Sequence, residues 1–280
     1  MAPTLILLRI SLVSLCCLFL GCRKPDVAPP PGTDPSIAFV HDGRPVRSLK
    51  LSELLARIPK EEWRGYDSYY NREKGWATLP LSRVVEAGFE GDVTKLDELD
   101  FIFRANDGYA VPFAGKKLVE PGAYLAFRDL DNVAWEPIGP QRANPGAFYV
   151  VWRGKDQQSL EAYPRPWQLA SIEVAAFEST YPHTFPRGGD AHAAHGFRLF
   201  REGCSSCHAM NREGGHVGPE LNVPQSIVEY RPEAQIRAYI VNPLTFRYGN
   251  MPAHSNLTKE DLDDLVAYFH AMKDQKYDPK

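Results

Sequence analysis

Cysteine is scarce in this chain, and its positions exclude several kinds of site. The 280 residues contain five cysteines, at positions 16, 17, 22, 204 and 207. No cysteine lies between Cys22 and Cys204, so a disulfide or a thiolate metal site within that long stretch is excluded. If Cys16 and Cys17 belong to a cleaved signal peptide and Cys22 carries a lipid, Cys204 and Cys207 are the only thiols left in the folded domains.

A strong excess of charge is also lacking. The chain has 32 basic and 35 acidic residues and a formal net charge of −3. This balance argues against nucleic acid as a partner and provides no strong field for steering a charged ligand. With 44% hydrophobic residues, the length allows two ordinary globular domains.

The one long apolar run lies near the N-terminus. It covers residues 10–20, which is too short for a typical membrane span, and ends in Phe19-Leu20-Gly21-Cys22. This ending resembles the lipobox of bacterial lipoproteins, which implies cleavage before Cys22 and a lipid on its sulfur. We therefore expect a signal peptide over residues 1–21 and a periplasmic lipoprotein anchored to a membrane. An uncleaved N-terminal anchor that starts near Leu5 is the alternative.

Proline punctuates the chain at two places where we expect connecting segments. Five prolines lie between Arg23 and Pro35, which predicts an extended tether over residues 22–35. Two prolines and a Gly-Gly pair predict a linker over residues 181–189. The domains expected on this basis cover residues 36–180 and 190–280.

Residues 36–180 alternate short β-type runs with turn residues. Such runs include residues 37–40, 101–103, 123–127, 148–152 and 171–174. Two short amphipathic helices are expected, one opening at Ser52 and one containing Leu81–Glu86. The pattern predicts an α+β domain with mostly antiparallel strands.

Several segments of this domain resemble the molybdopterin-binding domain of the sulfite oxidase family, in a shortened form. They include residues 49–55, 79–87, 103–109, 124–127 and 167–172. In that family a protein cysteine binds the molybdenum, and this stretch has none. We therefore expect no molybdopterin and a docking or scaffolding role. Arg104, Asp107 and Tyr109 are interpreted as an Asp-Gly turn beside a strand rather than as remnants of a site.

Cys204-Ser205-Ser206-Cys207-His208 is the most informative motif of the chain. Two cysteines separated by two residues and followed by histidine are typical of c-type haem attachment. Each thiol can bond one vinyl group of the porphyrin, and His208 is placed to ligate the iron. A redox dithiol would not need His208, and a structural zinc site would need a second ligand pair. The motif predicts one covalent haem c held by Cys204, Cys207 and His208.

Residues 190–280 resemble class I cytochrome c. Asp190 and Thr258 are good N-caps for helices on either side of the motif, and the second helix carries an apolar face. The resemblance implies an all-α domain whose terminal helices cross closely at Gly196. It also implies that the Pro219 carbonyl accepts a hydrogen bond from the imidazole of His208. At the crossing, the family's pattern matches Phe200, Leu265 and Tyr268.

The four methionines are the first candidates for the sixth iron ligand. Met1 belongs to the leader, Met210 lies two residues from His208, and Met272 lies near the end of the last helix. Met251, followed by proline in a loop before that helix, resembles the family's distal ligand. His216 and His254 are the alternative ligands.

A haem iron with His208 and Met251 as ligands has both axial positions filled, and this pair raises the reduction potential. We therefore expect a one-electron carrier or an electron-transfer subunit rather than an enzyme, with redox proteins docking at the haem edge. Two alternatives stay open. One is an oxidoreductase whose N-terminal domain binds a molybdopterin, and the other is a haem-based sensor that releases its distal ligand to bind a gas.

Overall fold

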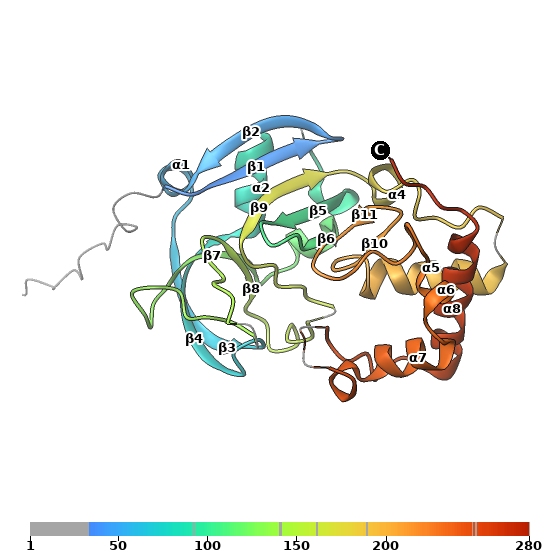
Figure 1. The fold of residues 1–280 in the computed structure, drawn as a ribbon. Helices are drawn as coiled ribbons and strands as arrows, with labels where there is room; N and C mark the ends of the chain where they lie inside the picture. Colours follow the sequence, from blue (N-terminus) through green and yellow to red (C-terminus); the bar gives the residue numbers. More distant parts are fainter. Residues whose placement is uncertain are drawn as a thin grey trace, which may run out of the picture. The chain divides into compact units, whose positions relative to one another are not determined.

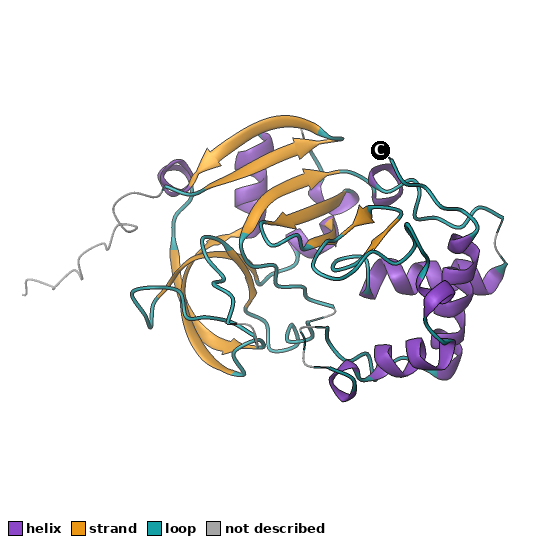
Figure 2. Cartoon of the chain, in the orientation of Figure 1, coloured by secondary structure: helices purple, strands orange, loops and turns teal. Residues whose placement is uncertain are grey.

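Two β-sheets form most of the first part of the chain (Figures 1 and 2). The computed structural model describes residues 34–279 apart from 92, 140–141, 161, 189, 248 and 250. One sheet has five strands in the order β2-β1-β9-β5-β6, and another has four in the order β3-β4-β7-β8. The bounds are Ser36–His41 (β1), Arg44–Lys50 (β2), Glu61–Asp67 (β3), Arg72–Pro80 (β4), Asp100–Ala105 (β5), Ala110–Ala114 (β6), Ala123–Asp129 (β7), Tyr149–Trp152 (β8) and Leu169–Val174 (β9).

The strand pairing confirms the expected α+β class with mostly antiparallel strands. Within these two sheets only β1 and β9 run parallel, and the other pairs are antiparallel. Helix α1 (Leu51–Arg57) and helix α2 (Leu81–Phe89) lie where the sequence predicts them, and α2 touches strands of both sheets. Their apolar faces join a buried cluster that includes Phe39, Phe103 and Trp152, so the main core of this part lies between helices and sheets.

The local sequence does not predict four strands of these two sheets, namely β2, β3, β4 and β6. Strand β3 alternates buried or half-buried with exposed residues and is rich in charge. Strand β4 begins with three charged residues and contains Gly75, and both features weaken the strand signal in the sequence. These segments form strands because they pair with neighbouring strands, and the local sequence does not reveal that pairing. Short helical turns also occur at Leu96–Glu98 (η1), Gly115–Val119 (α3) and Phe177–Thr180 (α4).

The second part of the chain is mainly helical. It contains α5 (Ala191–Gly203), α6 (Ile227–Tyr230), α7 (Glu233–Val241), η2 (Pro243–Thr245) and α8 (Lys259–Lys273). Asp190 accepts a hydrogen bond from the backbone N–H of Ala193, and Thr258 accepts one from that of Asp261. Both predicted N-caps are therefore confirmed.

Helices α5 and α8 cross at the predicted glycine. A Cβ atom built on Gly196 would lie 2.0 Å from the carbonyl oxygen of Asp264, so only glycine fits there. Around the crossing, Phe200 and Tyr268 are fully buried and their ring centroids lie 5.3 Å apart. This arrangement confirms the crossing that the resemblance implied.

The expectation of an all-α second part needs a correction. Two short strands, β10 (Ala209–Met210) and β11 (Glu213–Gly214), pair antiparallel directly after the haem motif. Asn211 and Arg212 join them with φ angles of 57° and 68°, the left-handed conformation that two-residue hairpin turns use. Strands β10 and β11 pair because of this turn, and no apolar run in the sequence marks them as strands.

The two parts share buried residues. Ile102, Ala110 and Phe177 belong to the same apolar cluster as Phe197, Leu265 and other residues of the helical part. Tyr181 and Thr184, inside the predicted linker, are 5% and 1% exposed. Residues 34–280 cluster as one compact unit, and the domain division at 181–189 stays a prediction.

The predicted signal peptide, Cys22 and most of the tether lie outside the described residues. Within the part that the structure describes, no helix has the length and apolar character to cross a membrane.

Candidate functional site

The haem motif forms a tight loop at the end of α5. The backbone N–H of Cys204 donates to the carbonyl of Phe200 at 2.9 Å, which closes the last turn of the helix. The N–H groups of Cys207 and His208 both donate to the carbonyl of Cys204, at 3.1 and 2.9 Å. The side chains of Cys204 and Cys207 are both partly exposed. The loop therefore presents both thiols and the imidazole within one turn of chain.

His208 is oriented by the segment that follows the hairpin. Its Nδ1 lies 2.8 Å from the carbonyl oxygen of Pro219, the contact that the sequence analysis expected. A Cβ atom built on Gly218 would lie 2.4 Å from Cε1 of His208, so glycine is required for the ring to lie in this place. With Nδ1 bound to a carbonyl, Nε2 is the nitrogen available to a metal.

Glu220 fixes the loop that carries this carbonyl. Its carboxylate accepts backbone N–H bonds from residues 211, 212, 222 and 223 at 2.7 to 3.1 Å. Asn222 in turn donates from its side chain to the carbonyl of Met272 at 2.7 Å. This loop is thereby tied to both the hairpin and α8, and the position of Pro219 follows from those bonds. Sequence reasoning assigned no role to Glu220.

The donor set fits a covalent haem. Burial lowers the pKa of His208 from its usual 6.5, which favours the neutral imidazole that a metal requires. Haem c attachment needs two thiols separated by two residues and an imidazole with one nitrogen held by a carbonyl, and this loop has both. Cys204, Cys207 and His208 would hold the group, which would supply a one-electron iron couple.

The candidates for the distal ligand lie in different surroundings. Met251 is half-buried and packs against the same apolar cluster as Cys204. The ring of His254 lies beside Gly203, and its charge contributes to lowering the pKa of His208. His216 is exposed, and its backbone N–H donates to the carbonyl of Gly108 at 2.8 Å, which ties it to the sheet part of the chain.

The haem motif also contacts the sheet part directly. The backbone N–H of Ala110 donates to the carbonyl of Ser206 at 3.0 Å, and Tyr109 shares a side-chain hydrogen bond with Ser206. Burial, together with the nearby charge of Asp107, raises the pKa of the Cys207 thiol to about 11. The Asp107–Tyr109 turn, interpreted from the sequence as a simple turn, thus contacts the haem motif; no local signal in the sequence shows this.

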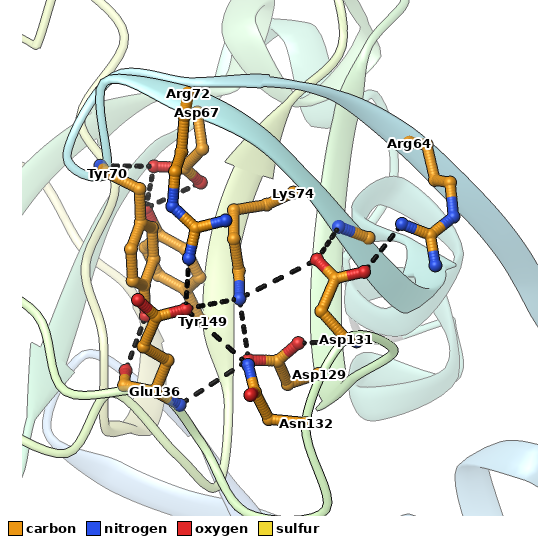
Figure 3. A network of polar contacts seen from close by, with 11 residues as sticks. Arg64, Asp67, Tyr70, Arg72, Lys74, Asp129, Asp131, Asn132, Glu136 and Tyr149 are labelled. Carbon is orange, nitrogen blue, oxygen red and sulfur yellow. Dashed lines mark hydrogen bonds and ion pairs between the residues drawn. The ribbon is translucent and has the colours of Figure 1, made fainter.

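A second concentration of charge lies on the four-stranded sheet (Figure 3). The Lys74 amine is fully buried and lies 2.8 Å from Asp129 and 2.9 Å from Glu136. Asp67, also buried, accepts hydrogen bonds from the Tyr149 hydroxyl and from the backbone N–H of Tyr69. Each carboxylate drawn in Figure 3 has a donor within the network. The network therefore fastens the loop after β7 to β4 and presents no open ligand set.

Histidine, cysteine and carboxylate side chains can bind a metal ion where several of them converge. No group of three or more such residues is arranged to hold a metal ion among the described residues. The haem motif therefore remains the site that the arrangement of donors supports.

The comparisons with known proteins agree with this site. Residues 193–273 match the family model described as cytochrome c. A curated protein, cytochrome c oxidase subunit 2 of Alkalihalophilus pseudofirmus, is 33% identical over 195 residues, which covers 61% of this chain. The chain spans 56% of that relative's length. The match over residues 193–273 supports a cytochrome c domain at the C-terminus, and with it haem-based electron transfer and redox partners.

Proposed function

We propose that this chain is a membrane-tethered, periplasmic c-type cytochrome that carries one electron at a time. The His208 imidazole held by the Pro219 carbonyl, next to the two thiols of the haem motif, is the observation that supports it most directly. One haem c is held covalently by Cys204 and Cys207, with His208 and Met251 as the iron ligands. With these two side chains as ligands, the haem would supply a one-electron iron couple without binding substrate.

The residues around the site keep the ligands in place when the iron changes its charge. The hydrogen bond from His208 Nδ1 to Pro219 fixes the ring plane, and the bonds to Glu220 hold that loop. Crossing of α5 and α8 at Gly196 fixes the helix that ends in the haem motif. A rigid ligand set lowers the reorganisation that each electron transfer requires.

The sheet part serves as a docking or scaffolding element in this proposal. Its resemblance to the molybdopterin-binding domain of sulfite oxidases would imply a cofactor pocket, but the stretch between Cys22 and Cys204 offers no thiolate for molybdenum. The cytochrome oxidase subunit named above is similar over about half its length, which supports electron exchange with protein partners. A lipid on Cys22 and the tether over 22–35 would hold the protein at the membrane.

Metal analysis of the purified chain tests the proposal. We expect one iron and no molybdenum per chain, together with reversible reduction and oxidation of the haem spectrum. Stoichiometric molybdenum would overturn the carrier in favour of the molybdopterin enzyme. Binding of carbon monoxide to the reduced native protein would instead indicate a sensor with a releasable distal ligand.

A further inference from the structure

The edge of the haem motif at Cys207 faces the turn between β5 and β6. Ala110 N–H donates to the Ser206 carbonyl at 3.0 Å, and His216 N–H donates to the Gly108 carbonyl at 2.8 Å. These two bonds lie on either side of Tyr109 in sequence, so they fix the turn at two points, one on the haem motif and one on the segment that follows the hairpin. Ser206 is 8% exposed in this arrangement. The β-turn and the haem motif therefore share a hydrogen-bonded, buried interface.

Two tyrosines of the sheet part lie at this interface. Tyr109 packs against the main core of the sheet part and shares a hydrogen bond with Ser206. Tyr69 lies in edge-to-face contact with Trp167, with ring centroids 5.0 Å apart. Burial raises the pKa of Tyr69 to about 12 and that of Tyr109 further, and Cys207 lies near enough to both to contribute. Both tyrosines are half-buried, and Tyr69 reaches the turn through Trp167, which donates to Asp107.

Asp107 supplies a negative charge at the same place. Its carboxylate accepts a hydrogen bond from Trp167 Nε1 at 2.9 Å and one from the backbone N–H of Tyr109 at 3.0 Å. The residues that follow it in the turn, Tyr109 and Ala110, are hydrogen-bonded to Ser206 of the haem motif. Asp107 is exposed to solvent, so its charge is screened by salt more than that of a buried carboxylate.

We propose that Asp107, Tyr109 and Tyr69 form one wall of the haem pocket, at the edge where Cys207 bonds the porphyrin, and that this wall sets the reduction potential. The inference rests on the proposed function, because it requires a haem on Cys204 and Cys207. It assigns to the sheet part a binding surface for the haem edge. Tyr109 acts by keeping water away from the haem, and Asp107 acts by its charge.

The two residues act with opposite sign. The oxidised haem carries one more positive charge than the reduced haem, so a dry, low-dielectric surrounding disfavours the oxidised form and raises the potential. A nearby carboxylate stabilises the oxidised form and lowers the potential. Opening the wall at Tyr109 therefore lowers the potential, and removing the charge of Asp107 raises it.

Redox titration of the full-length, haem-loaded protein tests this wall. We expect a lower midpoint potential in Tyr109→Ala, little change in Tyr109→Phe, and a higher midpoint potential in Asp107→Asn. Matched controls are Tyr66→Ala, at an exposed tyrosine of β3, and Asp97→Asn, at an exposed carboxylate of η1. Neither control is expected to shift the potential.

Salt separates the two effects. The Debye length falls from about 30 Å at 0.01 M to about 3 Å at 1 M ionic strength, so the shift in Asp107→Asn shrinks in high salt. The shift in Tyr109→Ala persists, because it arises from hydration rather than from a distant charge. General loosening of the loop would move both variants in the same direction.

Two results are distinguishable. If the protein carries covalent haem but Tyr109→Ala and Asp107→Asn match the wild-type potential, or shift it in the same direction, the wall is refuted and the cytochrome function stands. If no covalent haem is found on Cys204 and Cys207, the proposed function itself fails.

Discussion

Replacing Gly196 by alanine tests how closely α5 and α8 must approach to hold the haem motif. The added methyl group would lie 2.0 Å from the carbonyl oxygen of Asp264 and 2.7 Å from Cβ of Tyr268. The first neighbour is backbone within a helix, so it cannot rotate away. The two helices must separate, which loosens the buried contact between Phe200 and Tyr268.

The magnitude follows from two opposing terms. Alanine in place of glycine inside a helix stabilises it by about 1 kcal/mol. Overpacking a close contact costs about 1–3 kcal/mol, and a backbone neighbour places this site at the upper end. The net expectation is a loss of about 2 kcal/mol, or a fall in Tm of about 4–8 °C for a protein of this size.

Urea unfolding followed by haem absorption and by far-ultraviolet circular dichroism measures this loss. Gly203→Ala is the matched control, because it changes a glycine of the same helix where the new methyl group would meet only His254, at 3.8 Å. Stability of Gly196→Ala equal to or above that of the wild type would refute the close crossing.

Three further predictions concern the ligand, the anchor and a surface histidine. Met251→Ala abolishes the long-wavelength sulfur-to-iron absorption band of the oxidised protein and lowers its potential, and an unchanged spectrum would point to another ligand. Cys22→Ser moves the protein from the membrane fraction to the soluble fraction, and persistent membrane attachment would favour an uncleaved anchor. The hydrogen bond to Asp264 raises the pKa of His192 above 6.5, so its stabilisation is complete below pH 6.5 and is lost as the pH rises through the raised value. Urea unfolding across this pH range measures how steeply the free energy of unfolding falls with pH, and we expect a smaller fall in His192→Gln than in the wild type. An equal fall in both proteins would contradict the pairing.

Local sequence patterns predicted the parts of the fold that depend on neighbouring residues. Asp190 and Thr258 cap their helices because a short polar side chain can reach the exposed N–H groups of the next turn. The haem motif and the glycine-proline segment lie within twelve residues of each other in sequence, from position 208 to position 219, so their contact was also accessible.

The rest depends on pairings between residues far apart in sequence. Strands β3 and β4 carry many charged residues, and only their pairing with each other and with β7 shows them to be strands. The contact of Tyr109 with Ser206 joins positions separated by about a hundred residues, and neither position has a distinctive local pattern. The hairpin after His208 likewise depends on the left-handed conformation of Asn211 and Arg212, two residues common on any surface.

The central claim is that Cys204 and Cys207 bind one haem covalently, with His208 on the iron. Mass spectrometry of the purified, denatured chain tests it most directly, because a non-covalent haem is lost under these conditions. We predict a mass increase equal to one haem, located by proteolysis on the peptide that contains both cysteines and absent in the double variant Cys204→Ala/Cys207→Ala. An unmodified mass for the coloured, haem-containing wild-type protein would contradict the account.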